Sequence, residues 1–248
     1  MTRIIKIGGN EMNAPGFLEE LAAQLAQLEA AEPLVVVHGG GQDIAALQAR
    51  LGLEPVKVDG LRVTDAESLA VAQMVLSGHT NKHVVRALLA AGLDAVGLSG
   101  VDGGLLRCLK KAHPTVDLGL VGEITAVRAA LLTRLLDAGT LPVISPISLG
   151  EDGQIYNVNA DEAAGAIAAA LSAGALDFVS NVPGVLAGGE LLPALTTVAA
   201  EALIADGTVT GGMIPKVRTA LDALGRGVPR VRIVNLAGLS ASGGTVFS

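Results

Sequence analysis

The chain has 248 residues, a formal net charge of −7, a single cysteine and a 50% share of hydrophobic residues. This length can bury the core of one α/β domain, and the lone Cys108 excludes an internal disulfide framework and predicts a reducing, cytoplasmic location. The negative charge argues against nucleic acid as a partner, and because no charge-free segment reaches the roughly 20 residues of a membrane-spanning helix, no membrane partner is predicted.

Apolar runs typical of strands alternate along the chain with runs of helical spacing. Buried strands are predicted at residues 3–7 and 34–37, with a helix between them. Another helix is predicted to begin near Asp65, where Thr64 and Glu67 have the spacing of a capping box. Later strands are predicted at residues 95–98, 142–147, 178–180 and 230–234, and later helices at residues 129–137, 163–172, 198–205 and 214–224.

This alternation predicts the architecture of the chain. Strands joined by helices form a mainly parallel sheet that is covered on both faces. Residues 105–127 lack helical spacing and are predicted to form short hairpins at the edge of that sheet. A lobe boundary is predicted near residues 172–177, where two functional halves that share the sheet would meet.

Glycine clusters follow the first two predicted strands. Gly8 and Gly9, followed by Asn10, end the strand that contains Lys6, and residues 39–41 end the second strand and begin a helix. Glycines at such positions let backbone N–H groups approach an anion, and open α/β sheets bind ligands at the carboxyl ends of their strands. One cluster alone is more often a tight turn, and Lys6 alone can reach water from the end of its strand. Two clusters, one with a lysine, favour a phosphate site.

Three further segments place polar residues before predicted helices. Lys216 follows a glycine-containing loop at a helix N-terminus, which is a favourable place for an anion. Asn157 and Asn159 precede a helix for which Asp161 is a candidate N-cap, and capping alone would not require both asparagines. Arg62 can bind a carboxylate through its planar fork, although a surface charge is the commoner role for a lone arginine.

Taken together, these segments resemble the amino acid kinase family, and most closely its members that phosphorylate N-acetylglutamate. The resemblance implies a three-layer αβα sandwich with a mainly parallel central sheet. It also implies a single domain, residues 1–248, with an acceptor-binding N-lobe at about residues 1–172 and a nucleotide-binding C-lobe at residues 173–248. The matching stretches follow the family's order and lie at residues 5–9, 37–41, 60–64, 97–100, 157–161, 180–185 and 211–217.

The resemblance implies roles for individual residues. Lys6 and Lys216 would stabilise the transferring phosphoryl group, and Asp161 would orient both lysines. No protein-built metal site is implied, and the Mg²⁺ that accompanies ATP would be held mainly by the nucleotide phosphates. The acceptor would be held by Gly40, Gly41, Arg62, Asn157 and Asn159, and ATP by Gly8, Gly9, Ser180, Asn181, Gly184, Val185, Thr210 and Gly211.

The implied activity is the ATP-dependent phosphorylation of the side-chain carboxylate of N-acetyl-L-glutamate, a step of arginine biosynthesis. A carboxylate is already ionised at neutral pH, so its attack on a phosphoryl group needs no general base. Two alternatives stay open: a kinase for aminoadipate or glutamate attached to a carrier protein, and a nonenzymatic binding protein of the same fold. The two lysines argue against the second alternative, because a binding protein has no transition state to stabilise.

Two expectations concern assembly and regulation. Apolar positions at Leu69, Val71 and Met74, on the helix predicted after Asp65, favour a homodimer. In the family, members that arginine inhibits carry an additional helix before the first strand. The first strand here is predicted from Arg3, so the resemblance implies an enzyme that arginine does not inhibit.

Overall fold

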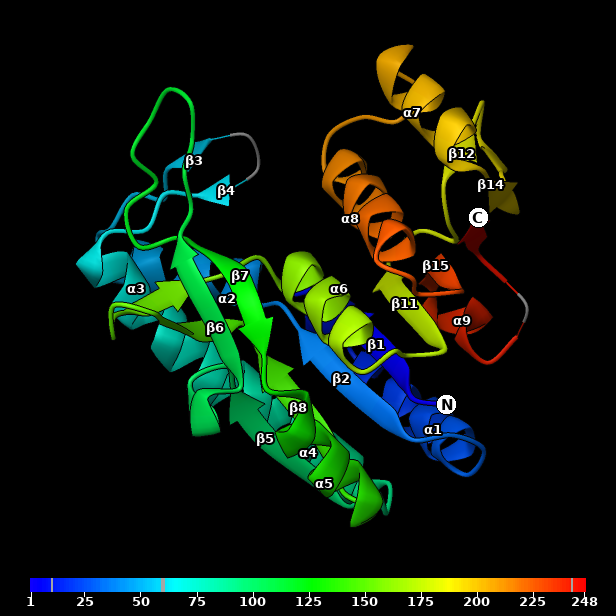
Figure 1. The fold of residues 1–248 in the computed structure, drawn as a ribbon, viewed down its shortest axis with the longest axis horizontal. Coiled ribbons are helices and arrows are strands. Elements are labelled where there is room, and N and C mark those ends of the chain that lie inside the picture. Colours follow the sequence, from blue (N-terminus) through cyan, green and yellow to red (C-terminus); the bar gives the residue numbers. More distant parts are fainter. Residues whose placement is uncertain (10, 59–60, 242) are drawn as a thin grey trace.

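The computed structural model describes residues 1–9, 11–58, 61–241 and 243–248. Asn10 and Gly60, which belong to two of the sequence motifs, lie outside the described residues. The main sheet runs in the order β14-β16-β15-β11-β1-β2-β8-β5 (Figure 1), and within the described chain all of its neighbouring strands are parallel except β15 and β16. Its strands are β1 (Arg3–Ile7), β2 (Leu34–His38), β5 (Ala95–Ser99), β8 (Leu141–Ser145), β11 (Ala175–Ser180), β14 (Ala194–Leu195), β15 (Val231–Asn235) and β16 (Thr245–Phe247).

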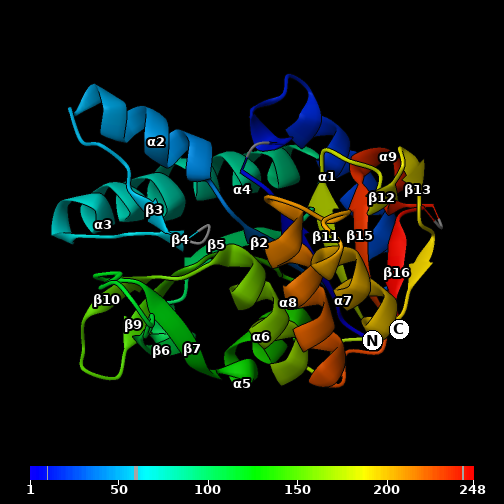
Figure 2. The ribbon, with the colours of Figure 1, turned by 90° about the horizontal axis from the view of Figure 1, so that it is seen from above.

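Helices cover both faces of this sheet (Figure 2). Because strand side chains alternate between faces, Ile5 and Ile7 of β1 belong to one buried cluster and Ile4 to another. The first cluster is covered by α1 (Phe17–Glu29), α4 (Asn81–Ala90) and α9 (Leu236–Leu239), and the second by α5 (Ala129–Asp137), α6 (Ala160–Ala170) and α8 (Met213–Gly225), with α7 (Thr197–Ala205) beside α8. The predicted three-layer αβα sandwich is confirmed.

A second, four-stranded sheet lies beside the first. It has the order β10-β9-β6-β7 and comprises β6 (Leu106–Lys110), β7 (Gly122–Val127), β9 (Ile147–Gly150) and β10 (Ile155–Asn157). The hairpin predicted within residues 105–127 is therefore present, but its placement at the edge of the main sheet was wrong. The strand predicted at residues 142–147 is divided at Pro146, which lies between β8 and β9 and has no N–H group for a ladder.

Shorter elements complete the region before β5 and the C-terminal half. The loop after β1 contains the 3₁₀ turn η1 (Glu11–Asn13), and α3 (Ala66–Gln73) continues into α4 through the π-helical segment η2 (Met74–Thr80). A further 3₁₀ turn, η3 (Asp102–Gly104), follows β5. The remaining elements are α2 (Gly41–Arg50), the ribbon of β3 (Lys57–Val58) with β4 (Leu61–Arg62), and the ribbon of β12 (Leu186–Ala187) with β13 (Glu190–Leu191). Of the helices in the described ranges, none combines the length and the hydropathy that a membrane crossing requires.

The start of α3 differs from the predicted capping box. Asp65 is its N-cap and accepts the Ser68 N–H at 2.7 Å, whereas the Thr64 hydroxyl donates to the Arg62 carbonyl.

The exposed apolar surface that was predicted on this helix is smaller than expected. Val71 is only 2% exposed and belongs to the core, although Met74 is 56% exposed. The homodimer therefore stays a prediction without Val71 as a contact residue.

Three charged residues form a buried ionic network on β1, β11 and β15. Asp177 of β11 is fully buried and accepts from Arg3 Nε at 2.6 Å and from Arg232 Nε at 2.8 Å. The register pairs Asp177 directly with Arg232. The same Arg232 guanidinium donates to the carbonyl oxygens of Leu239, Ala241 and Gly243, at 2.9 Å each. One arginine thus fastens the segment between β15 and β16 to the sheet.

Candidate active site

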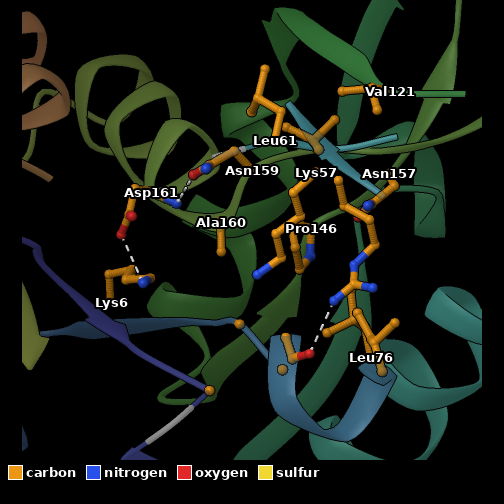
Figure 3. Close-up of a pocket in the computed structure, with 17 residues that line it drawn as sticks. Lys6, Lys57, Leu61, Leu76, Val121, Pro146, Asn157, Asn159, Ala160 and Asp161 are labelled. Atoms are coloured by element: carbon orange, nitrogen blue, oxygen red, sulfur yellow. Dashed lines mark hydrogen bonds and ion pairs between the residues drawn. The ribbon is translucent and has the colours of Figure 1, made fainter. Parts of the chain in front are cut away.

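A pocket opens at the carboxyl ends of β1 and β2, between the N-termini of α2 and α6 (Figure 3). The loops after the two strands touch here: a Cβ at Gly9 would lie 2.7 Å from both the N and Cα atoms of Gly40. Only a residue without a side chain permits that approach. The pocket brings together many of the residues that were predicted to bind or react, namely Lys6, Gly9, Gly40, Gly41, Arg62, Asn157, Asn159 and Asp161.

Two lysines converge on one carboxylate at the edge of this pocket. Lys6 points to the same face of the sheet as Ile4, toward α6, and Asp161 lies in the first turn of that helix. Lys6 Nζ lies 2.7 Å from Asp161 Oδ1, and Lys216 Nζ lies 3.7 Å from Asp161 Oδ2. The Lys6 contact is the closer of the two ion pairs. Each oxygen of Asp161 therefore faces one ammonium group.

The charges of these three groups favour an incoming anion. Burial acts to raise the pKa of Asp161, but the ammonium groups of Lys6 and Lys216 outweigh it and hold that pKa below its usual range. Burial, followed by repulsion from Lys6, lowers the pKa of Lys216, and the carboxylates of Asp161 and Glu11 only partly offset this. Two ammonium groups close to one ionised carboxylate leave a positive excess, which a phosphoryl group would neutralise.

Asn159, rather than Asp161, is the N-cap of α6. Its side-chain oxygen accepts from the N–H groups of Asp161 at 2.7 Å and Glu162 at 3.3 Å. The helix begins at Ala160, three residues earlier than predicted. The prediction of Asp161 as a candidate cap was therefore wrong. Because Asn159 satisfies the helix terminus, the Asp161 carboxylate is left to pair with the two lysines.

Arg62 forms the opposite wall of the pocket, on the β3–β4 ribbon. One Nη donates to the Gly41 carbonyl at 3.1 Å, and the other donates to the Gln48 side chain. Gln48 is fully buried and donates in turn to the Ser68 hydroxyl at 3.0 Å. Burial lowers the pKa of Arg62, but a guanidinium stays charged in proteins. These contacts fix the direction of the arginine fork, with Asn157 on the same pocket wall.

The buried His38 contacts the second glycine loop, residues 39–41, and helps to orient it. Its Nδ1 lies 2.9 Å from the Gly39 carbonyl, and the Asn81 amide lies 3.1 Å from its Nε2. A carbonyl can only accept, and the Asn81 nitrogen also donates to the Val143 carbonyl at 3.0 Å, so Nδ1 carries the proton. Burial lowers the pKa of His38 to about 4, so the ring is neutral at physiological pH.

Sequence reasoning missed the apolar part of the pocket and one cation. Lys57 lies opposite Arg62 in the register of the β3–β4 ribbon. Strands of two residues have no periodicity that a sequence pattern could reveal. The apolar residues come from separate elements that only the fold brings together: Ile44, Leu61, Leu76, Val121, Pro146, Val158 and Ala160.

A second hollow lies in the C-terminal half of the chain. It includes three residues predicted to bind ATP, and the Val185 N–H among them is already donated to the Thr245 hydroxyl at 2.8 Å. The second hollow is lined by Val182, Gly184, Val185, Leu186, Thr208, Val209, Thr210 and Met213.

Four other residues predicted to bind ATP line neither of the two hollows. Gly8 follows β1, Ser180 is the last residue of β11, Asn181 follows it, and Gly211 precedes α8.

The described ranges contain no group of three or more His, Cys, Asp or Glu side chains arranged to hold a metal ion. The cations and backbone groups of the pocket suit phosphate oxygens instead. A divalent cation that enters with a nucleotide would then be coordinated mainly by that nucleotide.

Comparison with known proteins identifies close relatives. A model of the amino acid kinase family matches residues 1–235. The chain is 55% identical to the acetylglutamate kinase of Roseiflexus sp. (strain RS-1) over 248 residues, which is 100% of this chain and 94% of that protein. It is 54% identical to the acetylglutamate kinase of Chloroflexus aurantiacus, over 99% of this chain and 96% of that protein. The crystal structure of smu.665 from Streptococcus mutans superposes with a TM-score of 0.89 at 29% identity, covering 100% of this chain and 98% of that one.

Proposed function

The chain belongs to the amino acid kinase family, as its motifs predicted, and from this premise we propose how its pocket phosphorylates a carboxylate. The protein is an enzyme, a phosphotransferase with a carboxyl group as its acceptor. Its reaction is the ATP-dependent phosphorylation of the side-chain carboxylate of N-acetyl-L-glutamate to an acyl phosphate, a step of arginine biosynthesis.

The proposed mechanism rests on one observation: Lys6 and Lys216 each form an ion pair with a different oxygen of Asp161. Asp161 holds both ammonium groups at the mouth of the pocket, at distances of 2.7 and 3.7 Å. Phosphoryl transfer spreads negative charge over the transferring group, and fixed cations stabilise that charge without reorganisation. Because the acceptor carboxylate is already ionised, the remaining requirement is alignment of the reacting groups.

The acceptor lies between the second glycine loop and Arg62. The N-terminus of α2 has no side-chain cap, so Gly40 and Gly41 present backbone N–H groups and the positive end of the helix dipole. Arg62 binds the carboxylate next to the α-carbon, and Asn157 and Asn159 bind the remaining polar groups of the acceptor.

ATP occupies the loops that follow β1 and β11 and the loop before α8. The positive excess at the lysines and the glycine loops fit its phosphates, and Mg²⁺ accompanies them, since the side chains that the structure describes form no carboxylate cage. When bound, this cation neutralises part of the phosphate charge. Gly8 and Gly9 face the phosphates, and the second hollow, with Gly184 and Thr210, takes the rest of the nucleotide.

The two substrates divide the chain into the lobes that the family resemblance implies. Residues 1–172 form the acceptor lobe and residues 173–248 the nucleotide lobe, and the main sheet passes from one to the other between β1 and β11. We also keep the homodimer and the cytoplasmic location in this proposal, the latter because the cytoplasm supplies ATP and keeps the buried Cys108 reduced.

Hydroxylamine trapping tests the reaction. Purified protein with ATP, Mg²⁺ and hydroxylamine should yield a hydroxamate from N-acetyl-L-glutamate, because hydroxylamine captures the acyl phosphate product. Reactions without ATP or without acceptor should yield none. Hydroxamate from carrier-bound aminoadipate or glutamate alone would transfer the assignment to that alternative, and ATP binding without any hydroxamate would favour a nonenzymatic binding protein.

Arg62→Lys should raise KM for N-acetyl-L-glutamate at least about tenfold and change KM for ATP much less. A lysine keeps the charge but cannot reproduce the planar fork that the Gly41 carbonyl and Gln48 hold in place. Steady-state kinetics with each substrate varied in turn measure both constants. Arg50→Lys, at the exposed end of α2, is the matched control. Equal changes in the two KM values would show that Arg62 acts on the fold rather than on the acceptor.

A further inference from the structure

Glu11 places a buried carboxylate among the groups proposed to bind the ATP phosphates. It begins η1, two positions after Gly9, and is 9% exposed. Its Oε1 accepts the backbone N–H of Asn181 at 3.1 Å, and its Oε2 lies so close to Gly8 that a Cβ there would overlap it. The carboxylate therefore lies between the loop after β1 and the loop after β11. Sequence reasoning did not single it out.

Among the residues that the structure describes, Glu11 has no cationic partner that neutralises its charge, since no Lys, Arg or His among them forms an ion pair with it. Its negative charge nevertheless acts on the reaction centre, since it works to raise the pKa of Lys216. An ATP molecule bound by the same loops would bring several more negative charges into this poorly screened region, where repulsion is stronger than in bulk water.

We propose that Glu11 makes the nucleotide site selective for ATP complexed with a divalent cation over free ATP. This inference rests on the proposed function of the loops as the ATP site. The carboxylate repels the phosphates of free ATP, and a cation that travels with the phosphates offsets that repulsion. Glu11 is thus a specificity-determining residue. It distinguishes free ATP from the ATP–cation complex by their net charge, and it takes no part in the chemical step.

A purely structural role for Glu11 would give a different experimental result. The hydrogen bond from the Asn181 N–H requires only an acceptor, and a glutamine side chain of the same length supplies one. Glu11→Gln therefore keeps the link between the two loops and removes only the charge. Glu19→Gln removes the same charge from the exposed side of α1 and is the matched control.

Calorimetric binding of a non-hydrolysable ATP analogue, with Mg²⁺ or with EDTA, tests the proposal without turnover. The ratio of the Kd in EDTA to the Kd in Mg²⁺ should fall by about tenfold in Glu11→Gln relative to the wild type. The fall should come mainly from tighter binding of the metal-free analogue. Glu19→Gln should keep the wild-type ratio. If Glu11→Gln does not fold, as judged by thermal melting, Glu11→Asn provides a second neutral side chain that carries an amide oxygen as acceptor.

An unchanged ratio in the neutral variants would overturn the proposal, and so would equal weakening of both Kd values, which would indicate that Glu11 only fastens the loops. Absence of analogue binding to the wild type, even with Mg²⁺, would instead count against the proposed ATP site itself. The two failures are therefore distinguishable.

Discussion

Replacing Lys6 with alanine is expected to lower kcat by about 10²-fold or more. The side chain is only 5% exposed, and its ammonium lies 2.7 Å from Asp161 at the edge of the pocket. A fixed charge in such a place stabilises the transition state without reorganisation, and water cannot replace it at comparable strength. Lys216→Ala should have an effect of the same order, because Lys216 faces the other oxygen of Asp161. Steady-state kinetics at saturating substrate concentrations measure the loss.

The fold should survive the loss of Lys6, because Lys216 still faces the Asp161 carboxylate. Circular dichroism and thermal melting test this point. Lys110→Ala is a suitable control, since that lysine is half exposed and pairs with Asp117 away from the pocket. Near-normal turnover of the Lys6 variant would remove this residue from the mechanism, and unfolding would show that the ion pair with Asp161 is mainly structural.

Asp177→Asn is expected to reduce the free energy of unfolding by roughly 3–5 kcal/mol. Asp177 is the shared partner of the buried Arg3 and Arg232, so the substitution leaves two guanidinium groups in the interior with no carboxylate between them. Arg232 also holds the carbonyl oxygens of the segment that joins β15 to β16, and that segment should loosen with it. Denaturant titration followed by circular dichroism measures the change.

Asp137→Asn, at the exposed end of α5, is the control for this prediction and should change the unfolding free energy by less than about 0.5 kcal/mol. A loss below about 1 kcal/mol in Asp177→Asn would mean that the two arginines are hydrated or find other partners. Because Asp177 points to the α1 and α9 face while Lys6 points to the α6 face, the variant should retain its KM values at temperatures where it stays folded.

Hydrophobic periodicity and glycine placement were sufficient to predict most of the main sheet and its covering helices. The strand at residues 3–7 and the helix at residues 129–137 occur with the predicted bounds. Period-two and period-3.6 patterns are local properties of the chain, so they can be read without knowledge of its neighbours. The order of the motifs also determined the family, and the relatives confirm it.

Only the tertiary structure decided which side chains meet. Asn159 and Asp161 are both acceptable caps in sequence, and the choice depends on the two lysines that approach Asp161 from β1 and α8. Glu11 likewise acquires its setting from Asn181, which is 170 positions away along the chain. Such contacts depend on strand order, register and helix packing. A sequence pattern specifies which face of an element is apolar, but it does not specify which distant element will cover that face.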